Sequence, residues 1–284
     1  MSARSARVAT VGQRLPVMAL TAFLFALQPE PGACDGVMLV DRGPFRMGSD
    51  GDGAAEAPAH GLYLEQFYID RLKVTNREFA AFLNARGLRS PEGEDYFDRD
   101  DADARIHRAR DAAGREGFVA DAGWEDHPAV EVSWFGARDY CAWKRTRLPT
   151  EAEWEKAARG DDRRRYPWGD APPTSERAVY GRSYNGTEPG DRRPAGASPH
   201  GVLDMAGNLR EWTSSQFRPY PYRAGDGREG GERAATRVVR GASHDDPAEE
   251  LRVTIRRFYE HRGVARGHHH IGFRCATSED LGGR

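Results

Sequence analysis

The amino-acid sequence predicts an α+β fold that is rich in loops and has short strands and few helices. The chain has 32 glycines and 17 prolines among its 284 residues, which favours turns, and 10% aromatic residues, which can anchor loops to a core. Apolar runs with strand character, such as residues 37–40 and 45–47, are short and bounded by turn residues. Segments that predict a helix are few and short.

The clearest helix signal lies between Thr150 and Gly160. Thr150 and Glu153 have the spacing of a capping box, in which each residue satisfies the backbone amide of the other, and Gly160 supplies a left-handed stop. Two further helices are expected. One begins at residues 75–78, because Phe79, Phe82 and Leu83 form an apolar helix face, and the other follows Ser133, which can cap it. These helices are interpreted as scaffold.

The N-terminal residues 1–33 have the pattern of an export signal. Arginines precede the apolar run 15–27, which is too short to span a bilayer comfortably, and small residues follow at positions 32–33. We therefore expect a periplasmic or secreted protein without an integral membrane span after signal removal. Cys34, directly after this segment, is either a lipidated first residue that anchors the protein or an unpaired cysteine.

Charge is nearly balanced along the chain. Lys and Arg number 42 against 44 Asp and Glu, so the net charge of -2 provides no field that would attract nucleic acid. Residues 90–117 are dense in charge, and the acidic run at 98–103 within them lacks the glycine and terminal glutamate of an EF-hand loop. We therefore expect a solvated insertion, with a calcium loop as the alternative. Residues 130–132, Val-Glu-Val, predict a strand.

Arg252, Arg256 and Arg257 can either bind an acidic substrate or form ion pairs, and ion pairs are favoured.

Five short motifs occur in a fixed order along most of the chain. They are RLPTEAEWE at 147–155, YPWG at 166–169, GVLDMAGNLREW at 201–212, RGAS at 240–243 and GFRC at 272–275. This order resembles that of the formylglycine-generating enzyme (sulfatase-modifying factor) family. The resemblance implies a C-type-lectin-like fold and one domain of that family over residues 37–278, which we expect to be a monomer.

Two cysteines inside this domain are candidates for a disulfide. Cys141 and Cys275 both lie beside aromatic residues, and an exported protein is exposed to oxidising conditions. The resemblance points the same way, because exported members of the family join cysteines at these places. Two buried free thiols are the alternative.

A calcium site is expected in the third motif. Carboxylate and amide side chains lie close together there, and a glycine allows carbonyl groups to point inward, which suits the six to eight oxygen ligands of Ca²⁺. The resemblance implies a structural calcium ion, and its ligands transfer to Asp204, Gly207, Leu209 and Glu211. A polar turn without metal is the alternative.

The copper-binding cysteine pair of formylglycine generators is missing from the sequence. Cu(I) needs soft thiolate ligands, and the resemblance places these two ligands at Asp246 and Leu251. No cysteine lies between Cys141 and Cys275. Conversion of a sulfatase cysteine to formylglycine by the family's usual chemistry is therefore not expected.

Histidines near the C-terminus offer a different set of ligands. His244 follows the RGAS motif and His270 ends a run of three histidines, and neutral imidazole suits iron or copper. The resemblance brings this region beside Ser243, so Ser243, His244, Asp246 and His270 are the candidate catalytic residues. The alternative is a run without function, since adjacent side chains on a strand point to opposite faces.

Three functions remain open. The first is an exported, oxidoreductase-like maturation factor acting on a small molecule or peptide, because the chain resembles a cysteine-free branch of the family that includes a periplasmic pyoverdine-maturation oxidoreductase. The second is a non-catalytic, lectin-like binding module. The third is a formylglycine-generating enzyme acting on sulfatases, against which the missing thiolates argue.

Overall fold

A computed structural model describes residues 36–279 except 111–112, 184 and 231–234. The expected export signal and Cys34 lie outside these residues. The described chain has four α-helices: α1 (Asn76–Arg86), α2 (Trp134–Trp143), α3 (Glu151–Arg159) and α4 (His261–Val264). Two short 3-10 helices, η1 (Pro194–Gly196) and η2 (Ala248–Leu251), interrupt the loops. The expected loop-rich α+β class is confirmed.

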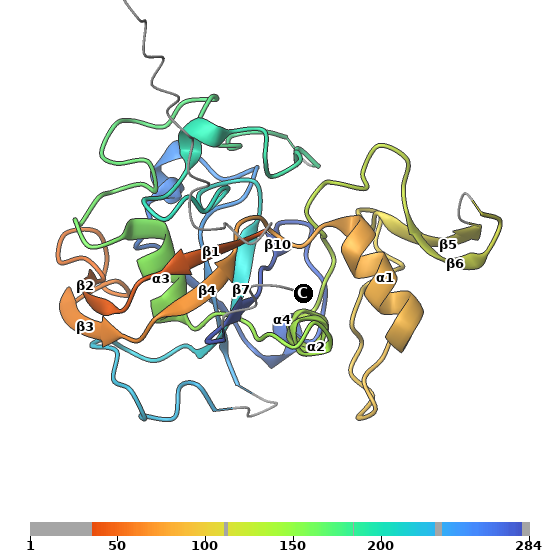
Figure 1. The fold of residues 1–284 in the computed structure, drawn as a ribbon, viewed down its shortest axis with the longest axis horizontal. Helices are drawn as coiled ribbons and strands as arrows, with labels where there is room; N and C mark the ends of the chain where they lie inside the picture. The colour runs from red at the N-terminus through yellow and green to blue at the C-terminus, as the bar shows by residue number, and fades with distance from the viewer. Residues whose placement is uncertain (1–35, 111–112, 184, 231–234, 280–284) are drawn as a thin grey trace, which may run out of the picture. The chain divides into compact units, whose positions relative to one another are not determined.

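The strands form two small sheets and two hairpins (Figure 1). One sheet has the order β1-β4-β11, from Val37–Val40, Phe67–Asp70 and Ala276–Thr277, so it joins both ends of the domain. The other has the order β10-β7-β8-β9, from Ile271–Gly272, Arg210–Gln216, Arg237–Arg240 and Arg256–Tyr259. The hairpins are β2-β3, from Gly43–Met47 and His60–Leu64, and β5-β6, from Ile106–Arg110 and Glu116–Ala120, which lies against α1.

Helix α3 has the ends that the sequence predicts. Glu153 donates its amide to Thr150 Oγ1 at 3.1 Å, and Thr150 donates its amide to Glu153 Oε2 at 2.8 Å. All nine residues of α3 are buried, although five of them are charged. Buried glutamates need partners, and Glu151 and Glu155 pair with Arg240 at the end of β8. The helix therefore joins the two sheets through buried charge as well as through Trp154.

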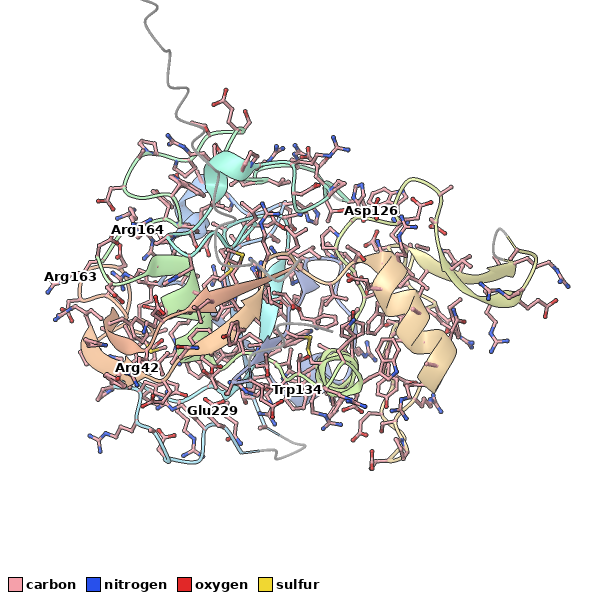
Figure 2. The ribbon with its side chains drawn as sticks, in the orientation of Figure 1. Arg42, Asp126, Trp134, Arg163, Arg164 and Glu229 are labelled. Carbon is pink, nitrogen blue, oxygen red and sulfur yellow. A yellow bond between two sulfur atoms is a disulfide. The ribbon has the colours of Figure 1, made fainter. Side chains whose placement is uncertain are left out.

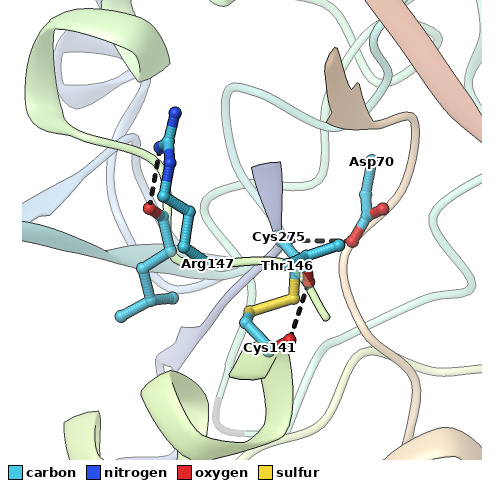
Figure 3. The surroundings of a disulfide bond; sticks show 6 residues. Asp70, Cys141, Thr146, Arg147 and Cys275 are labelled. Carbon is cyan, nitrogen blue, oxygen red and sulfur yellow. Dashed lines mark hydrogen bonds between the residues drawn. A yellow bond between two sulfur atoms is a disulfide. The ribbon is translucent and has the colours of Figure 1, made fainter. Parts of the chain in front are cut away.

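The expected disulfide between Cys141 and Cys275 is confirmed (Figure 3). It links the C-terminal half of α2 to the segment just before β11, within a core that includes Phe79 and Phe273, whose ring centroids lie 5.9 Å apart. Cys275 also donates its amide to the carboxylate of Asp70 at 2.9 Å. The bond thereby ties the aromatic core to the three-stranded sheet.

One local prediction is wrong, and a second is only partly confirmed. Residues 130–132 do not form a strand, because Glu131 has a left-handed backbone with φ of 58°. The acidic run is not a fully solvated insertion, since Asp103 at its end is buried. In contrast, the ion pairs expected for the C-terminal arginines are confirmed: Arg256 pairs with Glu151, and Arg252 and Arg257 likewise pair with carboxylates.

Charged side chains of both signs cover the outside of the domain. Among those labelled in Figure 2, Arg42, Arg163 and Asp126 are exposed. In the part of the chain that the structure describes, no helix has the length and apolar character needed to cross a bilayer.

Candidate functional site

Ser243 and Asp246 lie together in a tight turn that follows β8. Asp246 Oδ2 accepts hydrogen bonds from the amide of Ser243 at 2.7 Å and from its hydroxyl at 2.9 Å, and the second carboxylate oxygen pairs with Arg210. Ser243 Oγ also lies within hydrogen-bonding distance of the carboxylate of Asp245, so the two carboxylates share its single proton. These contacts hold the turn in place, so the carboxylate of Asp246 already has structural partners.

His244 is buried beside this turn with one ring nitrogen fixed. Its Nδ1 lies 3.1 Å from the carbonyl oxygen of Asn208, so Nδ1 carries the proton and donates to that oxygen. Burial lowers the pKa of His244, and the ring is therefore neutral. Its Nε2 is buried and has no hydrogen-bond partner among the described residues, which leaves a lone pair available.

His270 has a side-chain contact with a residue of strand β9. Its Nε2 is 2.6 Å from the hydroxyl of Tyr259 on β9, and burial with the nearby charge of Arg210 lowers the pKa of His270 to about 3. The ring is thus neutral and accepts the hydrogen bond from Tyr259. The structure places Ser243, His244 and Asp246 in one turn. His270 is connected to this turn through Arg210, whose amide donates to the carbonyl of His270 and whose side chain pairs with Asp246. The role of the four candidate residues in catalysis stays a prediction.

A different set of side chains has the composition of a metal site. The carboxylates of Asp103 and Glu131 and the ring of His269 offer one ligand atom each, and these three atoms lie within 4.8 Å of one another. Asp103 and Glu131 are only 1% and 2% exposed. His269 lies between two carboxylates, with Nδ1 3.8 Å from Asp103 Oδ2 and Nε2 3.7 Å from Asp245 Oδ2.

The electrostatics of this cluster favour a cation. Burial, together with the negative charges of Asp101, Asp98 and Asp103, raises the pKa of Glu131 to about 8. Asp103 Oδ1 accepts a hydrogen bond from Asn185 at 2.6 Å, but the buried Asp103 Oδ2 accepts none among the described residues. A buried carboxylate oxygen without a donor is costly unless a cation compensates it.

The backbone around Glu131 explains how the cluster forms. Glu131 donates its amide to the carbonyl of His268 at 3.2 Å, and its own carbonyl accepts from the amide of Asp98 at 2.9 Å. Gly267 lies so close that an added Cβ would be 2.2 Å from the carbonyl oxygen of Glu131. The left-handed Glu131 thus joins the acidic run to the histidine run.

Sequence reasoning missed Asp103, Glu131 and His269 as a set. The acidic run was interpreted as solvated, Glu131 as part of a strand, and His269 as one member of a run. The sequence does contain one local signal, because the apolar residues Ala104 and Ile106 directly follow the acidic run. Both are buried in the structure, so the chain turns into the core at this end of the run.

The four residues expected to bind calcium lie in one loop before and at the start of β7. Asp204, Leu209 and Glu211 are buried or nearly so, and Gly207 has a φ of 94°. The side chain of Lys73 enters this loop and contacts Asp204, Gly207 and Glu211. Calcium binding itself stays a prediction.

Comparisons with known proteins identify the family. The sequence pattern of the sulfatase-modifying factor enzyme 1-like domain matches residues 24–279. Hercynine oxygenase of Mycolicibacterium thermoresistibile is 39% identical over an alignment of 214 positions, which covers 69% of this chain and 47% of that protein. The formylglycine-generating enzyme of Streptomyces coelicolor is 34% identical over an alignment of 304 positions, which covers 90% of this chain and 95% of that enzyme.

A solved structure supports the same assignment. PvdO from Pseudomonas aeruginosa superposes with a TM-score of 0.62 at 25% identity and covers 84% of this chain and 93% of that chain. The chain spans about half the length of the hercynine oxygenases but nearly all of the formylglycine-generating enzyme. The expected fold is confirmed, and the chain belongs to the sulfatase-modifying factor enzyme family.

Proposed function

We propose that this chain is an exported, oxidoreductase-like maturation factor that acts on a small molecule through a metal ion held by Asp103, Glu131 and His269. The observation that carries the proposal is the buried Oδ2 of Asp103, which accepts no hydrogen bond among the described residues and lies 3.8 Å from His269 Nδ1. Because this oxygen is buried and has no hydrogen-bond donor among the described residues, a bound cation would compensate its negative charge.

The donor set indicates which metal fits. Two carboxylate oxygens and one imidazole nitrogen suit Fe(II), Mn(II) or Zn(II), whereas Cu(I) requires soft ligands. Of iron and copper, the two metals expected from the sequence, iron therefore fits better. Bound iron would supply one-electron chemistry with dioxygen, and three protein ligands leave coordination positions free for a substrate.

The surrounding residues have supporting roles in this proposal. With His269 Nδ1 toward the metal, Nε2 faces the Asp245 carboxylate, an arrangement that fixes the orientation of metal-binding imidazoles. His244 lies next to His269, with ring centroids 6.2 Å apart, and its free Nε2 can accept a proton from a bound substrate.

The relatives support this class of reaction. One relative is by name an oxygenase of hercynine, a small molecule, although this chain spans only about half of it. Positions 246 and 251 hold aspartate and leucine, and both are buried, so the copper-thiolate chemistry of formylglycine generators has no ligands there. Export rests on the predicted signal at residues 1–33.

Titration of the purified metal-free protein with ferrous iron in the absence of oxygen tests the proposal. We expect binding of one iron per chain, and we expect Asp103→Asn to weaken it by about 100-fold or more, since removal of a ligand exceeds the effect of removing a supporting residue. Asp100→Asn is the matched control, because Asp100 lies in the same run but its side chain is 85% exposed.

The outcomes separate the three functions. Iron binding lost in Asp103→Asn but kept in Asp100→Asn, together with oxygen uptake by the iron-loaded protein, supports the oxidoreductase. Absence of any bound iron, or equal binding by both variants, would refute the proposed site and favour a binding module. Formation of an aldehyde on a sulfatase peptide would instead show a formylglycine-generating enzyme.

A further inference from the structure

Lys73 occupies the position at which the family resemblance places a calcium ion. It lies in the loop between β4 and α1, and its side chain is only 1% exposed. Lys73 Nζ lies 2.9 Å from Asp204 Oδ2, 3.4 Å from Glu211 Oε1 and 3.5 Å from the carbonyl oxygen of Gly207. It also donates to the carbonyl oxygen of Asp204.

These oxygens belong to three of the four residues expected to bind calcium. An ammonium group and a calcium ion both require a set of oxygens that point inward, and they cannot occupy one position together. Calcium binds oxygens at 2.3 to 2.6 Å and takes six to eight of them, whereas Lys73 donates hydrogen bonds from a single nitrogen. The donor set with Lys73 in place does not fit a calcium ion.

The charge balance leads to the same conclusion. Two negative groups, Asp204 and Glu211, face two positive ones, because Arg274 Nε lies 2.7 Å from Glu211 Oε2 and Arg274 Nη2 lies 2.9 Å from Glu211 Oε1. Burial raises the pKa of Glu211, but Arg274 and then Lys73 more than offset this and hold it below its usual range. A divalent cation would leave an excess of buried positive charge, which is unfavourable.

The backbone of the loop keeps the shape of an ion-binding turn. Gly207 has a φ of 94°, and a Cβ there would meet the carbonyl oxygen of Val179 at 2.3 Å, so only glycine fits. Asp204 and Asn208 also have left-handed backbones, and Asn208 Nδ2 donates to Asp204 Oδ2 at 2.9 Å. The oxygens are thus held inward by the turn itself and not only by Lys73.

We infer that Lys73 replaces the structural calcium ion of the family, so that the loop 204–211 folds without calcium. The lysine supplies the positive charge from a neighbouring segment and links the loop to the start of α1. This inference concerns a site distinct from Asp103, Glu131 and His269 and does not depend on the function proposed above.

Thermal unfolding in calcium and in a calcium chelator tests the inference. The midpoint of the wild-type protein should be the same in both solutions. Lys73→Met removes the ammonium but leaves the oxygens, and calcium should raise its midpoint by at least about 3 °C relative to the chelator.

Two controls and one substitute variant make the result decisive. Lys144→Met, at an exposed lysine, should show no calcium effect. The Asp103→Asn background separates calcium in this loop from metal at the proposed catalytic site. If Lys73→Met does not fold in either solution, Lys73→Gln replaces it, since an amide can still donate to these oxygens. Stoichiometric calcium in the wild-type protein, or a folded Lys73 variant without a calcium response, would overturn the inference.

Discussion

Glu151, the first residue of helix α3, should be among the most sensitive positions of the fold. Its carboxylate joins two arginines: Arg256 Nη2 lies 2.9 Å from Glu151 Oε2, and Arg240 Nη1 lies 3.2 Å from Glu151 Oε1. All three side chains are 0% exposed. Glu151→Gln keeps the shape of the side chain and removes its charge, so two buried guanidinium groups lose a shared counterion.

The magnitude follows from what each arginine retains. Removing one partner of a buried ion pair costs about 3 to 5 kcal/mol, because the remaining charge is left uncompensated. Arg240 keeps Glu155, and Arg256 keeps the carbonyl oxygens of Ala55 and Arg218 as acceptors. We therefore expect the lower end, about 3 kcal/mol, which corresponds to a fall in Tm of about 6 to 12 °C for a domain of this size.

Urea unfolding of the wild-type protein and of Glu151→Gln measures this loss. Glu249→Gln is the control, since Glu249 is exposed in η2 and its replacement should leave the midpoint unchanged. A loss below about 1 kcal/mol for Glu151→Gln would refute the reasoning, because it would mean that the two arginines are solvated or paired in some other way.

Three further perturbations have defined outcomes. Reduction of the Cys141–Cys275 disulfide, which closes a separation of 134 residues, should lower the free energy of unfolding by about 4 kcal/mol in urea titrations, and an unchanged midpoint would contradict this. Burial raises the pKa of Asp70 to about 7, so between about pH 4 and pH 7 the native state holds a proton that the unfolded chain has released. The wild-type protein should therefore lose stability relative to Asp70→Asn as the pH rises from about 4 to about 7. Parallel stability profiles of the two proteins across this pH range would contradict the prediction. Gly267→Ala places a Cβ 2.2 Å from the carbonyl oxygen of Glu131, so it should lower the free energy of unfolding by about 1 to 3 kcal/mol and weaken iron binding. Gly61→Ala is the control, because its Cβ meets nothing within 4 Å and should change neither quantity. Equal stability and equal iron binding of the two variants would show that Gly267 does not pack tightly against Glu131.

The parts of the fold that depend on neighbouring residues could be predicted from the sequence. The ends of α3 follow from a capping box and a C-terminal glycine, all within one short segment. The same holds for α1, where Thr75 and Glu78 form a second capping box. Hydrogen bonds between residues three positions apart form whenever the helix forms, so they need no knowledge of the rest of the chain.

The candidate site could not be predicted in this way. Asp103, Glu131 and His269 come from three distant segments, and the left-handed backbone of Glu131 arises only because His268 and Asp98 take its two backbone hydrogen bonds. Read locally, Val130–Val132 has the composition of a strand. Tertiary hydrogen bonds overrode that preference.

By itself, the sequence determined both ends of α3, the order of the family motifs and the lack of cysteines at positions 246 and 251. The tertiary structure alone decided which charged groups are buried and which partner each one has. Lys73 and Glu211 are far apart in the chain, and only folding places the ammonium among the oxygens of the loop. The reason is physical: the cost of burying a charge depends on every group that surrounds it, and those groups come together only in the folded protein.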